Sequence, residues 1–383
     1  AGEFPMWDTT LWAGQPLLGQ AQPGAAYPLK RLLALAPLKN GHIQSWVLAW
    51  YYVLIHWMAA VFCFAFCREL GVRRLTAMAG GLIYALAGYL GTDMWPQMAN
   101  GAVWIPLVFL FQLRALRGAS VRLNGILAGT FLGVSYLSGH HQVPMLATVT
   151  MCLAWLWYRK WAAGGLSLVA MLAAGAFQIL PALEYGHLAM RWTGEGGLLT
   201  WNQMVPYLVH ADYGLQARSL FGLLVPGLKV NFDPFIGTVA FALAALAVAQ
   251  LWGQRETRWL FSMGLGALVY ALGHQCVFQG VAYAVVPQLN KARSPSAAVV
   301  LMQFAAAALA ARGLDLLLKK ADTTPWLRRI ELVAAGFGAL VGAVCLILIL
   351  THEGHFPGDD RVVATALVAL LLGLALHAYR RGL

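Results

Sequence analysis

The amino-acid sequence predicts an all-α polytopic membrane protein with about eleven transmembrane helices. Of its 383 residues, 60% are hydrophobic and only 11% are charged, and the mean hydropathy is +0.66. Soluble domains carry about 25% charged residues, so this composition is typical of a chain that crosses a membrane repeatedly. Apolar runs long enough to cross a bilayer recur along the chain. We place the spans at residues 46–67, 75–92, 99–113, 121–138, 143–159, 162–180, 236–252, 259–277, 296–318, 329–350 and 362–379.

Charge is distributed so that every second connection between these spans is basic. The segments 68–74, 114–122, 159–160, 255–258 and 312–329 and the tail Arg380–Arg381 hold 17 of the 26 lysines and arginines. Cytoplasmic loops carry an excess of Lys and Arg, so these connections are predicted to be cytoplasmic, with the C-terminus inside. The same bias accounts for the net charge of +11, and no nucleic-acid partner is expected.

The other connections are longer, and we predict that they lie on the outer face. They include the loop 181–235, and together they hold eight of the ten histidines. Any chemistry is therefore expected outside. We divide the chain into an outer interfacial loop, residues 1–45, and one transmembrane helical domain, residues 46–383, that includes the loop 181–235.

The interfacial loop contains many glycines and prolines, which do not suit a lipid environment, but also Trp7 and Trp12. Its last part predicts a short amphipathic helix that starts at Pro28, with leucines at the interface and Lys30 and Arg31 facing head groups. The alternative is a surface loop that only packs on the spans.

The turn Gly139-His140-His141-Gln142 is a candidate site at the outer end of two spans. Two imidazoles and an amide at a bilayer boundary can bind a phosphate or sugar hydroxyls. A zinc site would need i, i+4 spacing or further Cys and Asp ligands. The alternative is a helix-capping turn with interfacial histidines.

A second candidate is the set Glu184, His187 and Arg191. On a continuing helix these residues share one face by their i, i+3 and i+4 spacing. The carboxylate would act as a base and the arginine as a phosphate clamp. The alternative is an interfacial ion-pair network that orders the start of the loop.

Lys291 and Arg293 precede the span 296–318 on the outer side, against the positive-inside trend. A helix N-terminus capped by Ser294 and flanked by two cations is a good anion site. Lipid phosphate recognition and simple snorkelling to head groups both remain open.

Asp8 and Asp93 are the acids nearest the outer interface in their loops, and either could activate an acceptor hydroxyl. For each one an Asx-turn or a helix cap is the alternative. The sequence lacks a P-loop, a dinucleotide-binding glycine motif and a nucleophile elbow. Cys63 and Cys67 lie one helical turn apart without an adjoining His or acid, so we predict no metal site there.

Several short motifs occur in an order that resembles the YfhO-type family of bacterial membrane proteins, which has the GT-C glycosyltransferase fold. They are residues 2–8 (Gly-Glu-Phe-Pro-Met-Trp-Asp), 14–18 (Gly-Gln-Pro-Leu-Leu), 27–29 (Tyr-Pro-Leu), 104–107 (Trp-Ile-Pro-Leu), Gly139-His140 with Gln142, 178–181 (Gln-Ile-Leu-Pro) with Glu184 and Arg191, 233–237 (Asp-Pro-Phe-Ile-Gly), 271–273 (Ala-Leu-Gly) and 293–295 (Arg-Ser-Pro).

The resemblance implies a protein of the bacterial inner membrane with its large loops on the periplasmic side. It would transfer a sugar from a polyprenyl-phosphate carrier to a cell-envelope acceptor, with membrane lipids and the lipid-linked sugar as partners. Lys291 and Arg293 would hold the lipid phosphate, and a divalent cation stays open as a cofactor. The family pattern has a first span and a catalytic acid upstream of residue 2, so the chain is expected to be N-terminally incomplete or a degenerate relative. The alternative function is a non-catalytic GT-C-like subunit that packs in a larger membrane complex.

Overall fold

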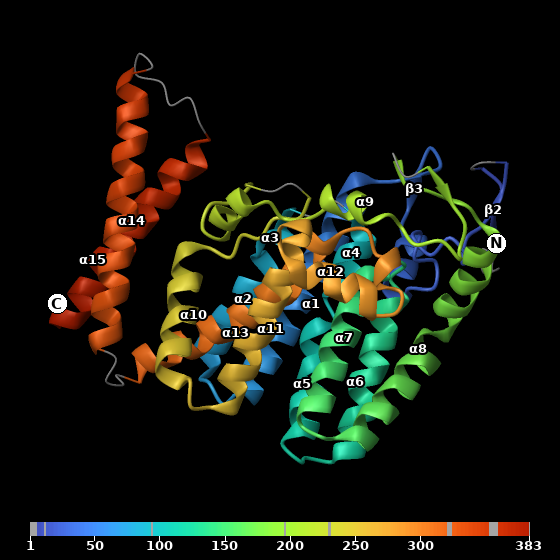
Figure 1. The fold of residues 1–383 in the computed structure, drawn as a ribbon, viewed down its shortest axis with the longest axis horizontal. Helices are drawn as coiled ribbons and strands as arrows, with labels where there is room; N and C mark the ends of the chain where they lie inside the picture. Colours follow the sequence, from blue (N-terminus) through green and yellow to red (C-terminus); the bar gives the residue numbers. More distant parts are fainter. Residues whose placement is uncertain are drawn as a thin grey trace.

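A computed structural model shows a bundle of helices with short strand pairs in the loops (Figure 1). It describes residues 6–10, 13–92, 95–194, 197–228, 231–319, 324–351 and 359–382. The helices are η1 (Pro28–Leu35), α1 (Ser45–Glu69), α2 (Arg74–Leu86), α3 (Gly88–Thr92), α4 (Pro96–Ala102), α5 (Ile105–Leu116), α6 (Val121–Tyr136), α7 (Gln142–Trp157), α8 (Trp161–Leu188), α9 (Tyr207–Ala211), η3 (Ala217–Leu223), α10 (Thr238–Leu251), α11 (Arg255–Ala271), η4 (Gly273–Gln275), α12 (Val277–Val285), η5 (Leu289–Lys291), η6 (Pro295–Ala298), α13 (Val299–Leu318), α14 (Thr324–Thr351) and α15 (Asp360–Arg381). The antiparallel strand pairs are β1 (Trp7–Asp8) with β2 (Gln15–Pro16), β3 (Leu38–Lys39) with β4 (His42–Ile43), and β5 (Arg191–Trp192) with β6 (Leu198–Leu199).

Each predicted span coincides with one to three consecutive helices, which confirms the prediction of an all-α membrane protein. In the described part of the chain, seven helical segments are long and apolar enough to cross a membrane. The helices α6, α7, α10 and α11 have only 14–17 residues. At 1.5 Å per residue they are shorter than a hydrocarbon core of about 30 Å. The count of eleven spans and the GT-C arrangement therefore stay predictions.

Helix α13 forms the centre of the bundle, and nearly all of its residues are buried. The ring of Phe304 on α13 contacts Phe66 of α1, Tyr84 of α2 and Phe109 of α5, with centroid distances of 4.8, 5.7 and 5.6 Å. Between lipid-embedded helices, close packing replaces the hydrophobic effect as the main stabilising force. Small residues permit that packing: a Cβ on Gly129 of α6 would lie 2.0 Å from the Ser167 carbonyl oxygen of α8.

One end of the bundle gathers four of the connections predicted to share a side. Arg114 near the end of α5 donates to Glu69, the last residue of α1, at 2.7 Å. Arg117 bridges Glu69 and Glu256, the latter at the start of α11. Asp315 near the end of α13 accepts from the backbone N–H of Arg73 at 3.0 Å. We call this the basic end. In Figure 1 it lies at the bottom, where the turns α5–α6, α7–α8 and α10–α11 are drawn.

The N-terminal segment packs over the opposite end. Tyr27 is completely buried and its hydroxyl accepts a hydrogen bond from Trp104 Nε1 at 3.0 Å. Gln178 of α8 donates to the Leu18 carbonyl oxygen at 2.6 Å. The predicted helix does start at Pro28, but it is a 3₁₀ helix, and it leaves Leu32 and Leu35 exposed. The segment thus both packs on the bundle and presents leucines at its surface.

Candidate functional site

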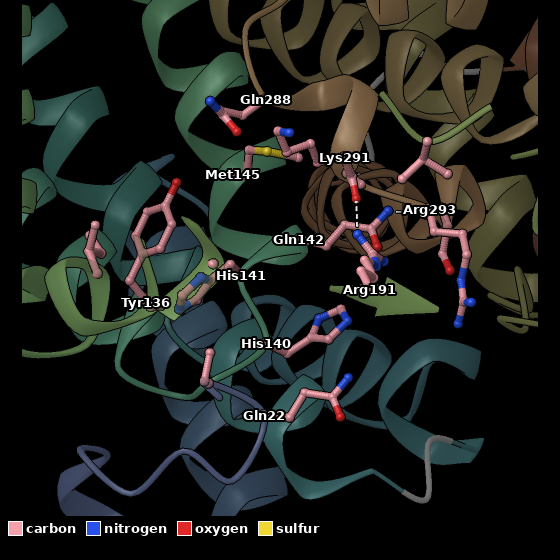
Figure 2. A pocket seen from close by; sticks show the side chains of 18 of the residues that line it. Gln22, Tyr136, His140, His141, Gln142, Met145, Arg191, Gln288, Lys291 and Arg293 are labelled. Carbon is pink, nitrogen blue, oxygen red and sulfur yellow. Dashed lines mark hydrogen bonds between the residues drawn. The ribbon is translucent and has the colours of Figure 1, made fainter. Parts of the chain in front are cut away.

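A cavity of about 1120 Å³ lies at the end of the bundle opposite the basic end (Figure 2). We call this end the cavity end. The walls come from residues 19–22, the α6–α7 turn, helices α7 and α8, the segments 189–191 and 199–205, and the segment 286–294 before η6. The structure brings six of the seven predicted substrate-binding residues to this cavity: His140, His141, Gln142, Arg191, Lys291 and Arg293. A cavity of this size suits a large ligand.

The α6–α7 turn is fixed by backbone contacts with the N-terminal segment. Gly139 has a φ of +95°, and a Cβ at this position would lie 2.2 Å from the Ala21 carbonyl oxygen. Gly24 packs as closely on the Ser138 carbonyl, at 2.3 Å from a Cβ position. Only glycine fits such a conformation and approach. The turn that carries the two histidines is therefore rigidly placed.

The two histidines of this turn point in different directions (Figure 2). His141 faces Tyr136, with ring centroids 5.6 Å apart, whereas His140 lies on the side of Arg191. His140 Nδ1 and His141 Nε2 are buried and have no hydrogen-bond partner among the described residues. His141 occupies the N-cap position of α7, but its side chain makes no capping hydrogen bond. The turn therefore carries two imidazoles that line the cavity, each with one buried ring nitrogen that has no hydrogen-bond partner among the described residues.

Both imidazoles are neutral at pH 7. Burial, with smaller effects of His141 and Arg191, lowers the pKa of His140 from 6.5 to about 4. Burial also lowers the pKa of His141 to about 4, against a hydrogen bond to the Tyr136 backbone that raises it. A neutral imidazole offers one N–H donor and one acceptor nitrogen, so each ring can bind a hydroxyl or a phosphate oxygen.

Three cations line the cavity, but they are held differently. Lys291 Nζ donates to the Trp201 carbonyl oxygen and lies 4.6 Å from the centroid of the Trp201 ring. Arg191 donates one Nη1 hydrogen bond to the Lys291 carbonyl oxygen at 2.6 Å. Arg293 stacks on Tyr213 at 4.4 Å and makes no hydrogen bond to a described residue. Lys291 therefore ties two loops together, while Arg191 and Arg293 keep free N–H groups.

No carboxylate balances these cations: among the described residues that line the cavity there is neither Asp nor Glu. Burial, followed by the nearby Arg293, lowers the pKa of Arg191. An arginine stays charged in a protein despite such a shift, so the two guanidinium groups repel each other. Two charged groups without a counter-charge form a good binding site for an anion.

The segment 286–294 is hydrogen-bonded to the start of α7 through the backbone of Ser294. Gln142 Nε2 donates to the Ser294 carbonyl oxygen. Ser294 stands at the N-cap position of η6, but its side chain makes no capping hydrogen bond, so the predicted side-chain cap is wrong. The helix begins as a 3₁₀ turn at Pro295, which needs no backbone N–H partner at that position. An anion in this cavity would therefore meet side chains and not a capped helix end.

The cavity continues as an apolar groove between α7 and α8. The α7 side is formed by Met145, Val149, Cys152 and Leu153, which are spaced about one turn apart. The α8 side is formed by residues near the end of that helix: Ile179, Ala182 and Leu183. Cys152 lies ten residues after Gln142, which corresponds to about 15 Å along the helix. The cavity therefore has a cationic part, lined by Arg191 and Arg293, that is continuous with the apolar groove.

The predicted face of Glu184, His187 and Arg191 does not form. Helix α8 ends at Leu188, and Arg191 lies in β5, where its backbone pairs with Leu199. Glu184 is exposed and does not line the cavity, which contradicts the expectation that it faces the ligand site. His187 is also exposed and packs on Trp201, with centroids 4.8 Å apart.

Asp8, one of the two predicted outer acids, does not line the cavity. Asp8 accepts hydrogen bonds from the backbone N–H of Thr10 at 2.8 Å and from its hydroxyl at 2.6 Å. This is the Asx-turn that was the alternative for this residue. Asp93 lies outside the described residues. Thr92 and Trp95, the described residues on either side, line the cavity.

Other residues of the site were not singled out from the sequence. Trp201 and Tyr213 support the cations, and the segment 19–22 forms a wall, although nothing in their local sequence indicates this. His210 is fully buried against Tyr283, with ring centroids 5.2 Å apart. Burial first, and then Arg191 and Arg293, lower the pKa of His210 to about 4. Only the clustering of histidines in the outer loops pointed toward it.

No family model, curated protein or solved structure matches the chain. The resemblance to YfhO-type proteins therefore stays a prediction from the motifs, and the function is argued from the cavity.

Proposed function

We propose that this chain binds a polyprenyl-phosphate-linked sugar in the cavity and serves as a membrane glycosyltransferase at the outer face of the bacterial inner membrane. The observation that carries the binding part is the charge of the cavity. Arg191 and Arg293 face a space that has no carboxylate among its described lining residues. That space continues into the apolar groove between α7 and α8. An anionic head group with a long apolar chain matches both parts.

The roles of the residues differ within this proposal. Arg293 and Arg191 would donate charge-assisted hydrogen bonds to the phosphate, because their guanidinium groups present several N–H donors in a fixed plane. Lys291 would position the loop 197–205 through Trp201, since its ammonium group already has protein acceptors. His140, His141 and Gln142 would contact the phosphate or sugar hydroxyls. The transfer step rests on the motif resemblance.

A second candidate function is a lipid-binding subunit without catalysis. It is favoured by the lack of a carboxylate among the described residues of the cavity wall, because glycosyl transfer needs a group that accepts the hydroxyl proton. Such a subunit would bind the same lipid and pack with other membrane subunits. Binding tests address both functions, and transfer of the sugar separates them.

The test is binding of a polyprenyl monophosphate to the purified chain in non-ionic detergent, followed by native mass spectrometry. Arg293→Gln and Arg191→Gln are each expected to weaken binding by about tenfold or more, as for a hydrogen bond to a charged group. Arg218 on η3 is exposed and does not line the cavity, so Arg218→Gln is the matched control and should bind normally. Equal binding by all four proteins would contradict the proposal.

A further inference from the structure

We infer that the cavity prefers a lipid phosphate monoester to a phosphodiester, and that His140 sets this preference by taking up a proton when the dianion binds. The inference rests on the proposed function, since it concerns the head group of the same ligand. A phosphate monoester carries nearly two negative charges at pH 7.5, whereas a diester carries one. A bound monoester can therefore balance about two positively charged side chains of the cavity, and a bound diester can balance one.

The geometry places His140 beside the two arginines. Burial leaves its Nδ1 without a hydrogen-bond partner among the described residues, and Gly139 fixes the turn that carries it. Arg191 is close enough to oppose a positive charge on the His140 ring. Burial is the main cause that keeps the ring neutral in the empty cavity, and His141 and Arg191 add to it. A bound dianion cancels the charge of the arginines and offers an oxygen to the imidazolium.

The other charged and titratable groups around His140 do not take this role. On its own turn, His141 faces Tyr136 and is held to the Tyr136 backbone. Before η6, Lys291 is bound to the Trp201 carbonyl, and Arg293, like Arg191 in β5, is charged at all relevant pH values. His210 of α9 lies near both arginines but does not line the cavity. Among the described residues that line the cavity, His140 is the imidazole that lies on the Arg191 side, and a dianion bound beside it would favour its protonated form.

This preference has a direct consequence for sugar transfer. When the sugar–phosphate C–O bond breaks, its electron pair stays on the phosphate oxygen, and the diester becomes a monoester with one more negative charge. The acceptor oxygen forms the new bond to the sugar carbon and releases its proton, which His140 takes up. A site that binds the monoester better than the diester stabilises the leaving group, and such differential binding promotes the reaction.

The experiment is isothermal titration calorimetry on the full chain in non-ionic detergent at pH 7.5, with hexadecyl phosphate and its monomethyl ester as probes. Titrations in two buffers of different ionisation enthalpy count the protons taken up. We expect the monoester to bind about tenfold more tightly than the methyl ester. We expect uptake of close to one proton with the monoester and of none with the methyl ester.

Substitutions assign the effect to one ring. His140→Gln should abolish both the preference and the proton uptake. His141→Gln should retain the preference. His274 on η4 is exposed and does not line the cavity, so His274→Gln is the matched control and should behave as the wild type.

The outcomes separate this inference from the proposed function. Equal binding of both probes without proton uptake would overturn the inference and leave the proposed function intact. A preference that survives in His140→Gln would also overturn it. If neither probe binds, the proposed function fails as well. If His140→Gln does not fold, the wild-type preference and proton count still decide between the outcomes.

Discussion

The two ends of the bundle both gather arginines, but they treat the charges differently. At the basic end, Arg114 and Arg117 pair with Glu69, and Arg117 also reaches Glu256 at 3.0 Å. At the cavity end, Arg191 and Arg293 face neutral imidazoles and no carboxylate among the described lining residues. The first arrangement is paired within the protein, whereas the described lining residues supply no counter-charge for the second.

This difference separates a cluster whose charges are paired within the protein from one that could pair with an added anion. Paired charges at a surface contribute modestly to stability and gain nothing from an added anion. Unpaired guanidinium groups beside a cavity repel each other, and an anion that enters relieves this repulsion. A count of basic residues alone would favour the basic end as the place where an anion binds. The pairing of those residues with carboxylates favours the cavity end instead.

The largest expected effect comes from adding one methyl group at the α6–α7 turn. Gly139→Ala combines a φ of +95° with a Cβ only 2.2 Å from the Ala21 carbonyl oxygen. We expect a loss of about 3 kcal/mol or more in the free energy of unfolding, and loss of lipid phosphate binding, because the histidine turn must move. Thermal unfolding and the binding assay measure the two effects.

The matched control lies at the basic end. Gly118 in the α5–α6 turn has a φ of +93°, but a Cβ there has no atom within 4 Å. Gly118→Ala should therefore cost only about 1 kcal/mol of backbone strain and leave binding unchanged. Similar losses of binding in the two variants would break the comparison between the ends.

The second effect is a dependence of stability on pH that comes from the cavity end. The pKa values of His140 and His141 are about 4 in the fold and near 6.5 in the unfolded chain. Between these values the unfolded chain binds more protons, so stability falls as the pH is lowered from about 6.5 to about 4 and is fully present above 6.5. We expect roughly 1 kcal/mol per pH unit for each histidine.

Melting temperatures of the ligand-free protein across this pH range test the prediction. The double variant His140→Gln/His141→Gln should show a shallower slope, and His210 should account for part of what remains. A slope that does not change in the double variant would show that these imidazoles are not buried in the neutral state.

The smallest effect is expected at the basic end. Glu69→Gln removes the partner of Arg114 and one of the two partners of Arg117. Because the Glu69 side chain is still 22% exposed, water and salt screen the pairs, and we expect a loss of at most about 1 kcal/mol in stability. Lipid binding should not change. Binding that weakens with this variant would mean that the two ends are coupled, contrary to the comparison.

The sequence predicted the helices well, because an apolar run of sufficient length has few alternatives in a membrane protein. Every predicted span coincides with helical residues, and Pro28 does begin a helix. The type of that helix and the end of α8 were not predictable. Arg191 lies beyond the end of α8 and donates a hydrogen bond to the Lys291 carbonyl oxygen, a hundred residues away. Spacing along one segment cannot show such a partner.

The site could be predicted only as a set of separate parts. Polarity at the ends of spans identified the histidine turn, Arg191 and Arg293, which the fold brings to one cavity. The roles of Lys291 and Ser294 depend on tertiary contacts with Trp201 and Gln142, and the local sequence does not reveal these contacts. Glu184 was selected for its chemistry, but the helix turns it outward, where it is exposed.

The most direct test of the central claim is an electron cryomicroscopy structure of the chain with a bound polyprenyl monophosphate, using an antibody fragment to add mass. The proposal predicts phosphate density within hydrogen-bond distance of Arg191 and Arg293, with the chain running between α7 and α8. Density for the lipid elsewhere, with the cavity empty or filled by side chains, would contradict it.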